Sequence, residues 1–93
     1  MLTLTPNARR ALQEISARAR LPEEGGLRIA ESPEHLGTFQ LSLVPAPMPG
    51  DKVIEDEGAR VFVEPLTAAV LADQQLDAAR SVEGTGFLLA PRT

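Results

Sequence analysis

The alternation of apolar and polar positions predicts a β-hairpin in the middle of the chain. Two apolar runs, Val53-Ile54 and Val61-Phe62-Val63, flank the polar turn Glu55-Asp56-Glu57-Gly58. β-Branched and aromatic residues favour strands, and the glycine that ends the turn can take the positive φ that a tight turn needs. We therefore expect two antiparallel strands, with the apolar residues of the second strand near the core.

Apolar residues at helical spacing predict two helices. Thr5 is a good N-cap and Pro6 suits the first helical position, so the first helix is expected over about 6–19. Pro65 opens the second helix, expected over about 65–72. The residues expected to face inward are Ala8, Ala11, Leu12, Ile15 and Ala19 in the first helix, and Leu66, Ala69 and Val70 in the second.

Strict alternation predicts further strands in the first half of the chain. Leu2-Thr3-Leu4 is expected to form a short edge strand, and Leu27-Arg28-Ile29-Ala30-Glu31 a half-buried one. Phe39, Leu41 and Leu43 alternate with polar residues, so we expect all three side chains to point into the core.

The C-terminal part of the chain predicts two more strands. Residues 75–82 are expected to form one strand, and Phe87-Leu88-Leu89 the last, with a turn at Gly84-Thr85-Gly86 between them. In the earlier of these strands the residues expected to share one face are Leu76, Ala78 and Val82.

Proline and glycine mark the connections. Residues 31–37 contain Ser32, Pro33 and Gly37 and are expected to form a loop. Prolines at every second position of residues 45–49 exclude a central strand and predict a stiff connector. The expected class is α+β, a small mixed β-sandwich-like body with two covering helices, formed by a single domain over residues 1–93.

Composition limits the classes of function. The net charge of −4 argues against nucleic acid as a partner, because phosphate binding needs a basic face. The chain has no cysteine, which excludes disulfides, thiolate catalysis and cysteine-ligated metal within these residues. No apolar run approaches the roughly 20 residues of a membrane span, and no signal-peptide pattern opens the sequence. We expect a soluble cytoplasmic protein.

The sequence offers few groups for chemistry. His35 is its only histidine and lies beside Glu34, so this pair is the candidate metal site. Zinc needs three or four ligands, which favours a solvated loop instead. One histidine supplies no specific set of nucleophile, base and acid, and Gly84-Thr85-Gly86 is too short for a phosphate loop. We therefore expect a protein that is not an enzyme, with no cofactor assigned.

An ordered set of short stretches carries a resemblance to a known family. They are Leu2-Thr3-Leu4-Thr5, Gly26-Leu27-Arg28-Ile29, Phe39-Gln40-Leu41-Ser42-Leu43, Gly50-Asp51-Lys52-Val53-Ile54-Glu55, Gly58-Ala59-Arg60-Val61-Phe62-Val63, Leu76-Asp77 and Gly84-Thr85-Gly86-Phe87-Leu88-Leu89-Ala90-Pro91. In order and spacing this set resembles the HesB/IscA-like family of A-type iron–sulfur cluster carriers. The resemblance covers nearly the whole chain.

The resemblance implies a compact β-rich fold, assembly as a dimer or tetramer, and a role in holding iron or an iron–sulfur cluster for delivery to other proteins. Family members hold the cluster with three cysteines. One lies in the loop that corresponds to residues 31–37, and two form a Cys-Gly-Cys motif after the last strand. This chain has Glu34-His35 in that loop and ends at Pro91-Arg92-Thr93, so no family ligand transfers to any of its residues.

Two functions follow as hypotheses. The first is a cysteine-less member of the family that acts as a binding or scaffold module beside a protein of the iron–sulfur assembly system. The second is a metal-binding protein that holds iron or zinc through Glu34, His35 and further carboxylates across a homodimer interface. Neither involves nucleic acid or a membrane.

Overall fold

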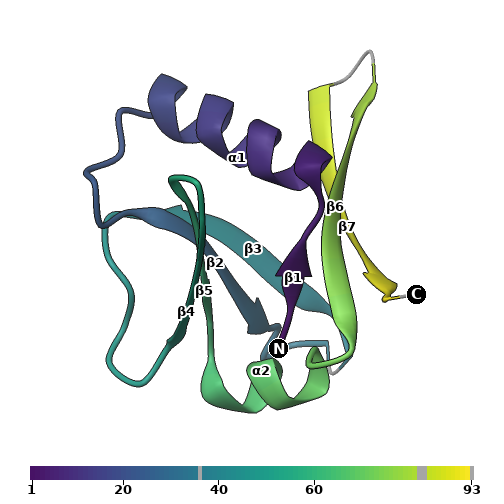
Figure 1. Cartoon of the computed structure of the whole chain (residues 1–93). Coiled ribbons are helices and arrows are strands. Elements are labelled where there is room, and N and C mark those ends of the chain that lie inside the picture. The colour runs from purple at the N-terminus through teal and green to yellow at the C-terminus, as the bar shows by residue number, and fades with distance from the viewer. Residues whose placement is uncertain (36, 82–83, 93) are drawn as a thin grey trace.

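The structure is a computed structural model that describes residues 1–35, 37–81 and 84–92. Within them the order is β1 (Thr3–Leu4), α1 (Pro6–Arg18), β2 (Gly26–Glu31), β3 (Phe39–Val44), β4 (Lys52–Asp56), β5 (Ala59–Val63), α2 (Pro65–Val70), β6 (Gln74–Ser81) and β7 (Gly84–Pro91). Figure 1 shows α1 along one end of the strands and α2 at the other. This mixture of strands and two helices confirms the α+β expectation.

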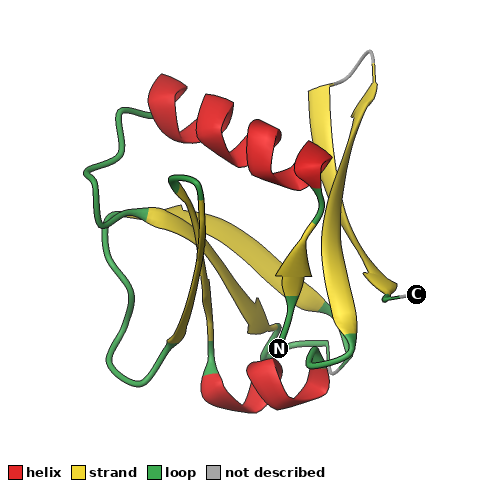
Figure 2. Ribbon diagram, in the orientation of Figure 1, coloured by secondary structure: helices red, strands yellow, loops and turns green. Residues whose placement is uncertain are grey.

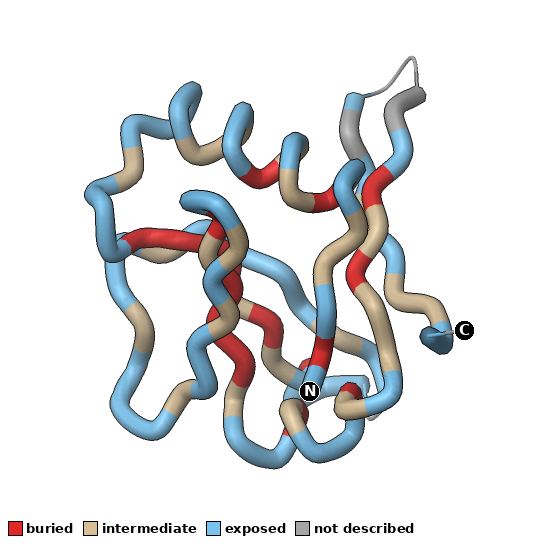
Figure 3. The backbone as a smooth tube through the Cα atoms, in the orientation of Figure 1, coloured by how far each residue is buried: buried red, intermediate tan, exposed pale blue. Residues whose placement is uncertain are grey.

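The strands form two sheets among the described residues (Figure 2). A four-stranded sheet has the order β3-β2-β5-β4, in which β2 runs parallel to β5 and antiparallel to β3. A three-stranded sheet has the order β1-β6-β7. The core lies where the sheets and α1 meet, and Figure 3 shows its buried positions along β2, β5 and β6. Its fully buried members include Leu12, Ile29, Val61, Val63 and Leu76.

Local signals place the central hairpin and the helix starts as expected. β4 and β5 pair antiparallel, and Glu57 and Gly58 at the turn have φ values of 49° and 91°. Two consecutive positive φ values are typical of the tight turn whose twist matches that of paired strands. The Thr5 side chain accepts a hydrogen bond from the Ala8 N–H, so it caps α1 as predicted.

The predicted inner face of α2 is wrong. Leu66 and Val70 are 77% and 64% exposed, and Ala69 is exposed as well. The buried side of α2 instead carries Thr67, and Leu71 follows it one turn later. α2 is only six residues long and nearly all apolar. Apolar residues at helical spacing therefore occur on both of its sides, and the pattern alone does not tell which side is buried.

The predicted burial of the β3 side chains is also wrong in part. Leu41 and Leu43 pair with Ile29 and Leu27, so they do share the core-facing side of the sheet. They are nevertheless 37% and 38% exposed, because β3 is an edge strand and the second sheet does not extend over it. Phe39 is half-buried and packs against the core.

The expected turn at Gly84-Thr85-Gly86 is part of strand β7. Gly84 pairs with Ser81 and Gly86 with Ala79, so the ladder continues up to residue 84. The apolar face of β6 is confirmed at Leu76 and Ala78, which are buried, whereas the expectation for Val82 lies outside the described residues.

Candidate functional site

The loop between β2 and β3 carries the candidate pair Glu34 and His35, and both residues are exposed. Backbone hydrogen bonds close this loop, from the Ser32 N–H to the Thr38 carbonyl at 2.7 Å and from the Thr38 N–H to the His35 carbonyl at 3.0 Å. The Glu31 carboxylate accepts the Gly37 N–H at 3.1 Å and is therefore engaged within the loop.

No third ligand joins this pair in the part of the chain that the structure describes. Among those residues no three His, Cys, Asp or Glu side chains gather in a way that could hold a metal ion. Glu34 and His35 are neighbours in sequence, and two such groups fall short of the three or four ligands of a protein zinc site. Within one copy, the described residues therefore do not complete a metal centre at this loop.

The acidic turn of the hairpin is paired with α1. Arg9 lies 3.3 Å from a Glu57 carboxylate oxygen and 3.7 Å from one of Asp56. The Gln13 side-chain amide also donates to the Glu57 carbonyl at 2.7 Å. These contacts join the hairpin tip to the first helix, although the Glu57 side chain stays 71% exposed.

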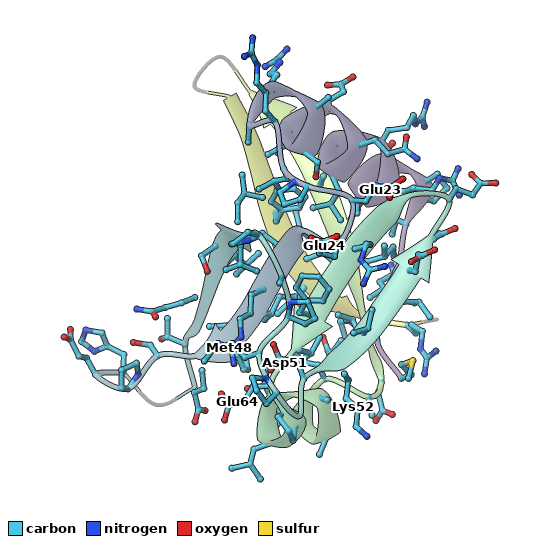
Figure 4. All side chains as sticks on the ribbon, turned by 90° about the vertical axis from the view of Figure 1, so that its left-hand side faces the viewer. Glu23, Glu24, Met48, Asp51, Lys52 and Glu64 are labelled. Carbon is cyan, nitrogen blue, oxygen red and sulfur yellow. The ribbon has the colours of Figure 1, made fainter. Side chains whose placement is uncertain are left out.

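An ion pair that sequence reasoning missed ties the proline-rich connector to the four-stranded sheet. The Arg28 guanidinium on β2 donates to both Asp51 carboxylate oxygens, at 2.9 and 3.1 Å. Asp51 also accepts the Met48 N–H at 3.0 Å and its side chain is only 1% exposed. Figure 4 shows Met48 and Asp51 close together in front of the sheet. We call Arg28, Met48 and Asp51 the connector clamp.

The clamp shifts the pKa values of both charged partners. Burial alone raises the pKa of Asp51, but hydrogen bonds from Arg28 and the Met48 N–H, with the Arg28 charge, bring it below its usual value. The hydrogen bond to Asp51 raises the pKa of Arg28 against the opposing effect of burial. Both groups therefore stay ionised at neutral pH. The signal in the sequence was an arginine inside an apolar strand, but its partner lies 23 residues away.

Phe62 is fully buried on the side of the sheet that bears Arg28, with which it is in register. The Arg60 guanidinium carbon lies 5.5 Å from the centre of this ring, and its NH1 atom pairs with Glu55 at 2.7 Å. The Arg60 Nε is buried and has no hydrogen-bond partner among the described residues. The outer face of the sheet therefore has a packed layer of its own, which the sequence pattern did not predict.

The described residues form several surface hollows, of which three are considered as ligand sites. One of about 580 Å³ lies between the end of α1 and the hairpin and is walled by acidic residues that include Glu23 and Glu24, both labelled in Figure 4. A second, of about 590 Å³, lies between α1 and β6 beside Asp77. A third, of about 310 Å³, is mainly apolar and lies between Met1 and Leu2 at the N-terminus, the β4–β5 hairpin and α2. None of them contains an arrangement of catalytic side chains.

Asp77 in the second hollow is a structural group. It accepts the Thr5 hydroxyl at 2.6 Å and the Ala78 N–H at 2.8 Å. The bond from Thr5, followed by the bond from the Ala78 backbone, lowers the pKa of Asp77. Thr5 therefore caps α1 and joins it to β6 through one hydroxyl group.

No described helix is long and apolar enough to cross a membrane.

The chain is similar in sequence over nearly its whole length to a protein of Cereibacter sphaeroides. That relative is an uncharacterized protein in the nifU 5′ region, and it is 33% identical over 89 residues, which are 95% of this chain and 84% of the relative. No protein-family model matches the chain.

Solved structures agree with this relationship. SufA of Escherichia coli, which is involved in the biosynthesis of iron–sulfur clusters, superposes with a TM-score of 0.79 at 26% identity, over 97% of this chain and 84% of SufA. IscA with the [2Fe–2S] cluster gives 0.74 at 20% identity, over 98% of this chain and 85% of IscA. A protein from Aquifex aeolicus gives 0.76 at 20%, over 98% and 91%. The chain belongs to the HesB/IscA-like family, as a divergent member without the cysteines that hold the cluster in that family.

Proposed function

We propose that this protein is a binding or scaffold module of iron–sulfur cluster assembly that does not itself hold a cluster. The observation that carries the proposal is the β2–β3 loop, in which Glu34 and His35 occupy the region of the family's first ligand cysteine. The surrounding fold is preserved, since SufA covers 97% of the chain. A preserved fold without ligand cysteines fits a function that depends on the family's fold but not on thiolate ligands.

The chemistry of the loop supports the part of the proposal that concerns the cluster. Iron in these clusters is held by soft thiolate ligands, and carboxylate or a single imidazole is a poor replacement. The Glu31 carboxylate at the start of the loop already accepts the Gly37 N–H. The loop is thus stabilised by its own backbone and has no need of a metal ion to close it.

The relatives support the part of the proposal that concerns the pathway. SufA is described as involved in the biosynthesis of iron–sulfur clusters, and IscA has been solved with a [2Fe–2S] cluster. The relative from Cereibacter sphaeroides is placed beside nifU. We infer that this chain works in the same process through protein contacts, without catalysing a reaction.

Affinity capture from the source cells under anaerobic conditions tests this function. The bait is the folded wild-type chain, and the control bait is an unrelated domain of similar size and net charge. Mass spectrometry should find proteins of iron–sulfur assembly enriched on the chain alone, and titration of the purified partner should then give saturable binding. Failure to enrich any such protein, or binding that the control bait reproduces, would contradict the proposal.

A further inference from the structure

Strand β4 lies at a free edge of the four-stranded sheet. The order β3-β2-β5-β4 leaves β4 paired with β5 alone. In an antiparallel edge strand, every second residue directs its N–H and C=O groups away from the sheet. No backbone hydrogen bond from another element reaches β4 in the part of the chain that the structure describes. β4 therefore presents open backbone donors and acceptors that an added strand can use.

An apolar pocket lies beside the core-facing side of β4. Lys52 and Ile54 pair with the fully buried Val63 and Val61, so they lie on that side of the sheet. The same two residues line the pocket of about 310 Å³, whose other walls come from the N-terminal residues, β5 and α2. This volume is about ten times the share of one water molecule in the liquid, so an aliphatic side chain fits inside. β3, the opposite edge of the sheet, lines none of the three surface hollows.

Lys52 is the charged side chain of this pocket, and it is exposed. The two acidic residues of β4 already have partners, since Glu55 pairs with Arg60 at 2.7 Å and Asp56 lies 3.7 Å from Arg9. Lys52 forms no ion pair with any residue that the structure describes. Figure 4 shows it near α2, at the start of β4. An unpaired ammonium group beside an apolar pocket favours a ligand that has a carboxylate next to an aliphatic group.

We propose that β4 and its pocket bind an extended segment of a partner protein, which joins the sheet as a further strand. The choice of a protein as the occupant rests on the proposed function as a binding module. Residues of the added strand opposite Lys52 and Ile54 point to the same side of the sheet as those two. An acidic residue there meets Lys52, and an aliphatic residue two positions away enters the pocket. The residue between them is apolar, because it lies opposite Val53, which is 42% exposed on the outer side.

The surroundings of β4 favour such a segment over a small molecule or a second copy of this chain. A small aliphatic carboxylate would use Lys52 and the pocket but none of the open backbone groups. A second copy paired through its own β4 offers Asp56 to Lys52, but Asp56 already lies close to Arg9. The other edge strands, β1, β3 and β7, contain no acidic residue. A partner with a free carboxylate satisfies all three features of this edge.

Nuclear magnetic resonance titration of the full chain with a synthetic peptide tests the proposal. The peptide has seven residues with blocked ends: leucine at the third position, valine at the fourth, glutamate at the fifth and threonine elsewhere. Antiparallel pairing, the more stable arrangement, places this leucine opposite Ile54 and the glutamate opposite Lys52. Saturable shifts should centre on the amides of β4 and α2. Peptides with lysine for the glutamate, or serine for the leucine, should each bind at least about threefold more weakly.

A charge exchange and a matched control make the test specific. Lys52→Glu should weaken binding of the glutamate peptide at least about threefold and should bind the lysine peptide more tightly than the wild-type chain does. Ala69→Leu, at an exposed position in the pocket wall, fills the pocket and should weaken the glutamate peptide by a similar factor. Leu41→Ser, on the opposite edge strand, is the control and should leave the affinity unchanged. Thermal melts check that each variant is folded.

Four results would overturn the proposal: no saturable shifts, shifts centred on β3, folded Lys52→Glu and Ala69→Leu variants that bind both peptides as the wild-type chain does, or β4 signals that change with protein concentration alone. The last result would mean that a second copy covers the edge. Affinity capture with Lys52→Glu as the bait separates this site from the proposed function. Assembly proteins retained in full by that bait would refute the site alone, whereas peptide binding by a chain that captures no such protein would refute the function alone.

Discussion

At the scale of single residues, one carboxylate holds the proline-rich connector against the sheet. Asp51 is nearly inaccessible and receives hydrogen bonds from Arg28 and the Met48 N–H. Removing one charge from a buried pair leaves the other uncompensated, at a cost of about 3–5 kcal/mol. Asp51→Asn should lower the free energy of unfolding by about 3 kcal/mol, the lower end of that range, because Arg28 remains 20% exposed.

Urea unfolding measures this loss, and Asp56→Asn is the matched control. Asp56 is 36% exposed and lies 3.7 Å from Arg9, a geometry that contributes about 0–1 kcal/mol. Equal losses in the two variants would show that the clamp is no stronger than an ordinary surface pair.

The same carboxylate predicts how stability depends on pH. The pKa of Asp51 is lowered in the folded state, so its contribution is complete above the unfolded-state value of about 3.9. That contribution is lost as the pH falls through the folded-state pKa, and Asp77 adds to the loss in the same direction. At pH values below about 4, the urea concentration at the unfolding midpoint of the wild-type protein should therefore decrease as the pH is lowered. The decrease should be smaller for Asp51→Asn. A wild-type midpoint that rises on acidification would contradict the sign of both shifts.

His35 tests whether the β2–β3 loop binds metal. Its side chain is exposed, and the loop is closed by backbone hydrogen bonds that do not involve the imidazole. His35→Ala should change the free energy of unfolding by less than about 0.5 kcal/mol. Zinc or ferrous iron should leave the melting temperature of both proteins unchanged, since only a ligand that binds the native state raises it. A metal-dependent rise that the substitution abolishes would support metal binding.

At the scale of secondary structure, position within the sheet decides what an apolar residue contributes. Ile29 and Leu41 are paired across β2 and β3 and share one face, yet Ile29 is fully buried and Leu41 is 37% exposed. Ile29→Ala should cost about 2–5 kcal/mol through lost burial and a cavity. Leu41→Ala should cost about 1 kcal/mol, because part of that side chain already meets water. Chemical denaturation of both variants compares them, and similar losses would mean that β3 is covered in solution.

The sequence predicted those elements that depend on neighbouring residues. Thr5 and Pro6 begin α1, Gly58 ends the hairpin turn, and Pro65 begins α2, because capping and turn conformation are local properties. The exposed side of α2 and the exposure of β3 depend on which distant element covers them, and periodicity contains no such information. The sequence pattern therefore predicted the correct face of Leu41 but the wrong burial.

The candidate site shows the same difference between features set by neighbouring residues and features set by distant ones. The loop of Glu34 and His35 was placed correctly at the surface, since a proline and a glycine beside polar residues predict a loop. The connector clamp was missed, because Arg28 and Asp51 are 23 residues apart and nothing in their spacing pairs them. The pocket beside α2 was missed for a related reason. Its walls come from Met1 and Leu2 before β1, and from β4, β5 and α2, which only the folded chain brings together.

At the scale of the whole molecule, the family fold is retained although the chain has no cysteine. Its apolar core, its hairpin and its connector are stabilised by packing, hydrogen bonds and ion pairs that need no metal. The proposed function accordingly assigns the protein a part in assembly through its surfaces and not through a bound cluster.

Anaerobic reconstitution with ferrous iron and sulfide tests this account most directly. The protein is desalted afterwards, and iron, acid-labile sulfide and the visible spectrum are measured beside a cysteine-containing member of the family treated in the same way. We expect this chain to stay colourless with iron and sulfide far below one per chain, because no thiolate is present to hold them. Stoichiometric iron and sulfide, with the broad visible absorption of a bound cluster, would contradict the account.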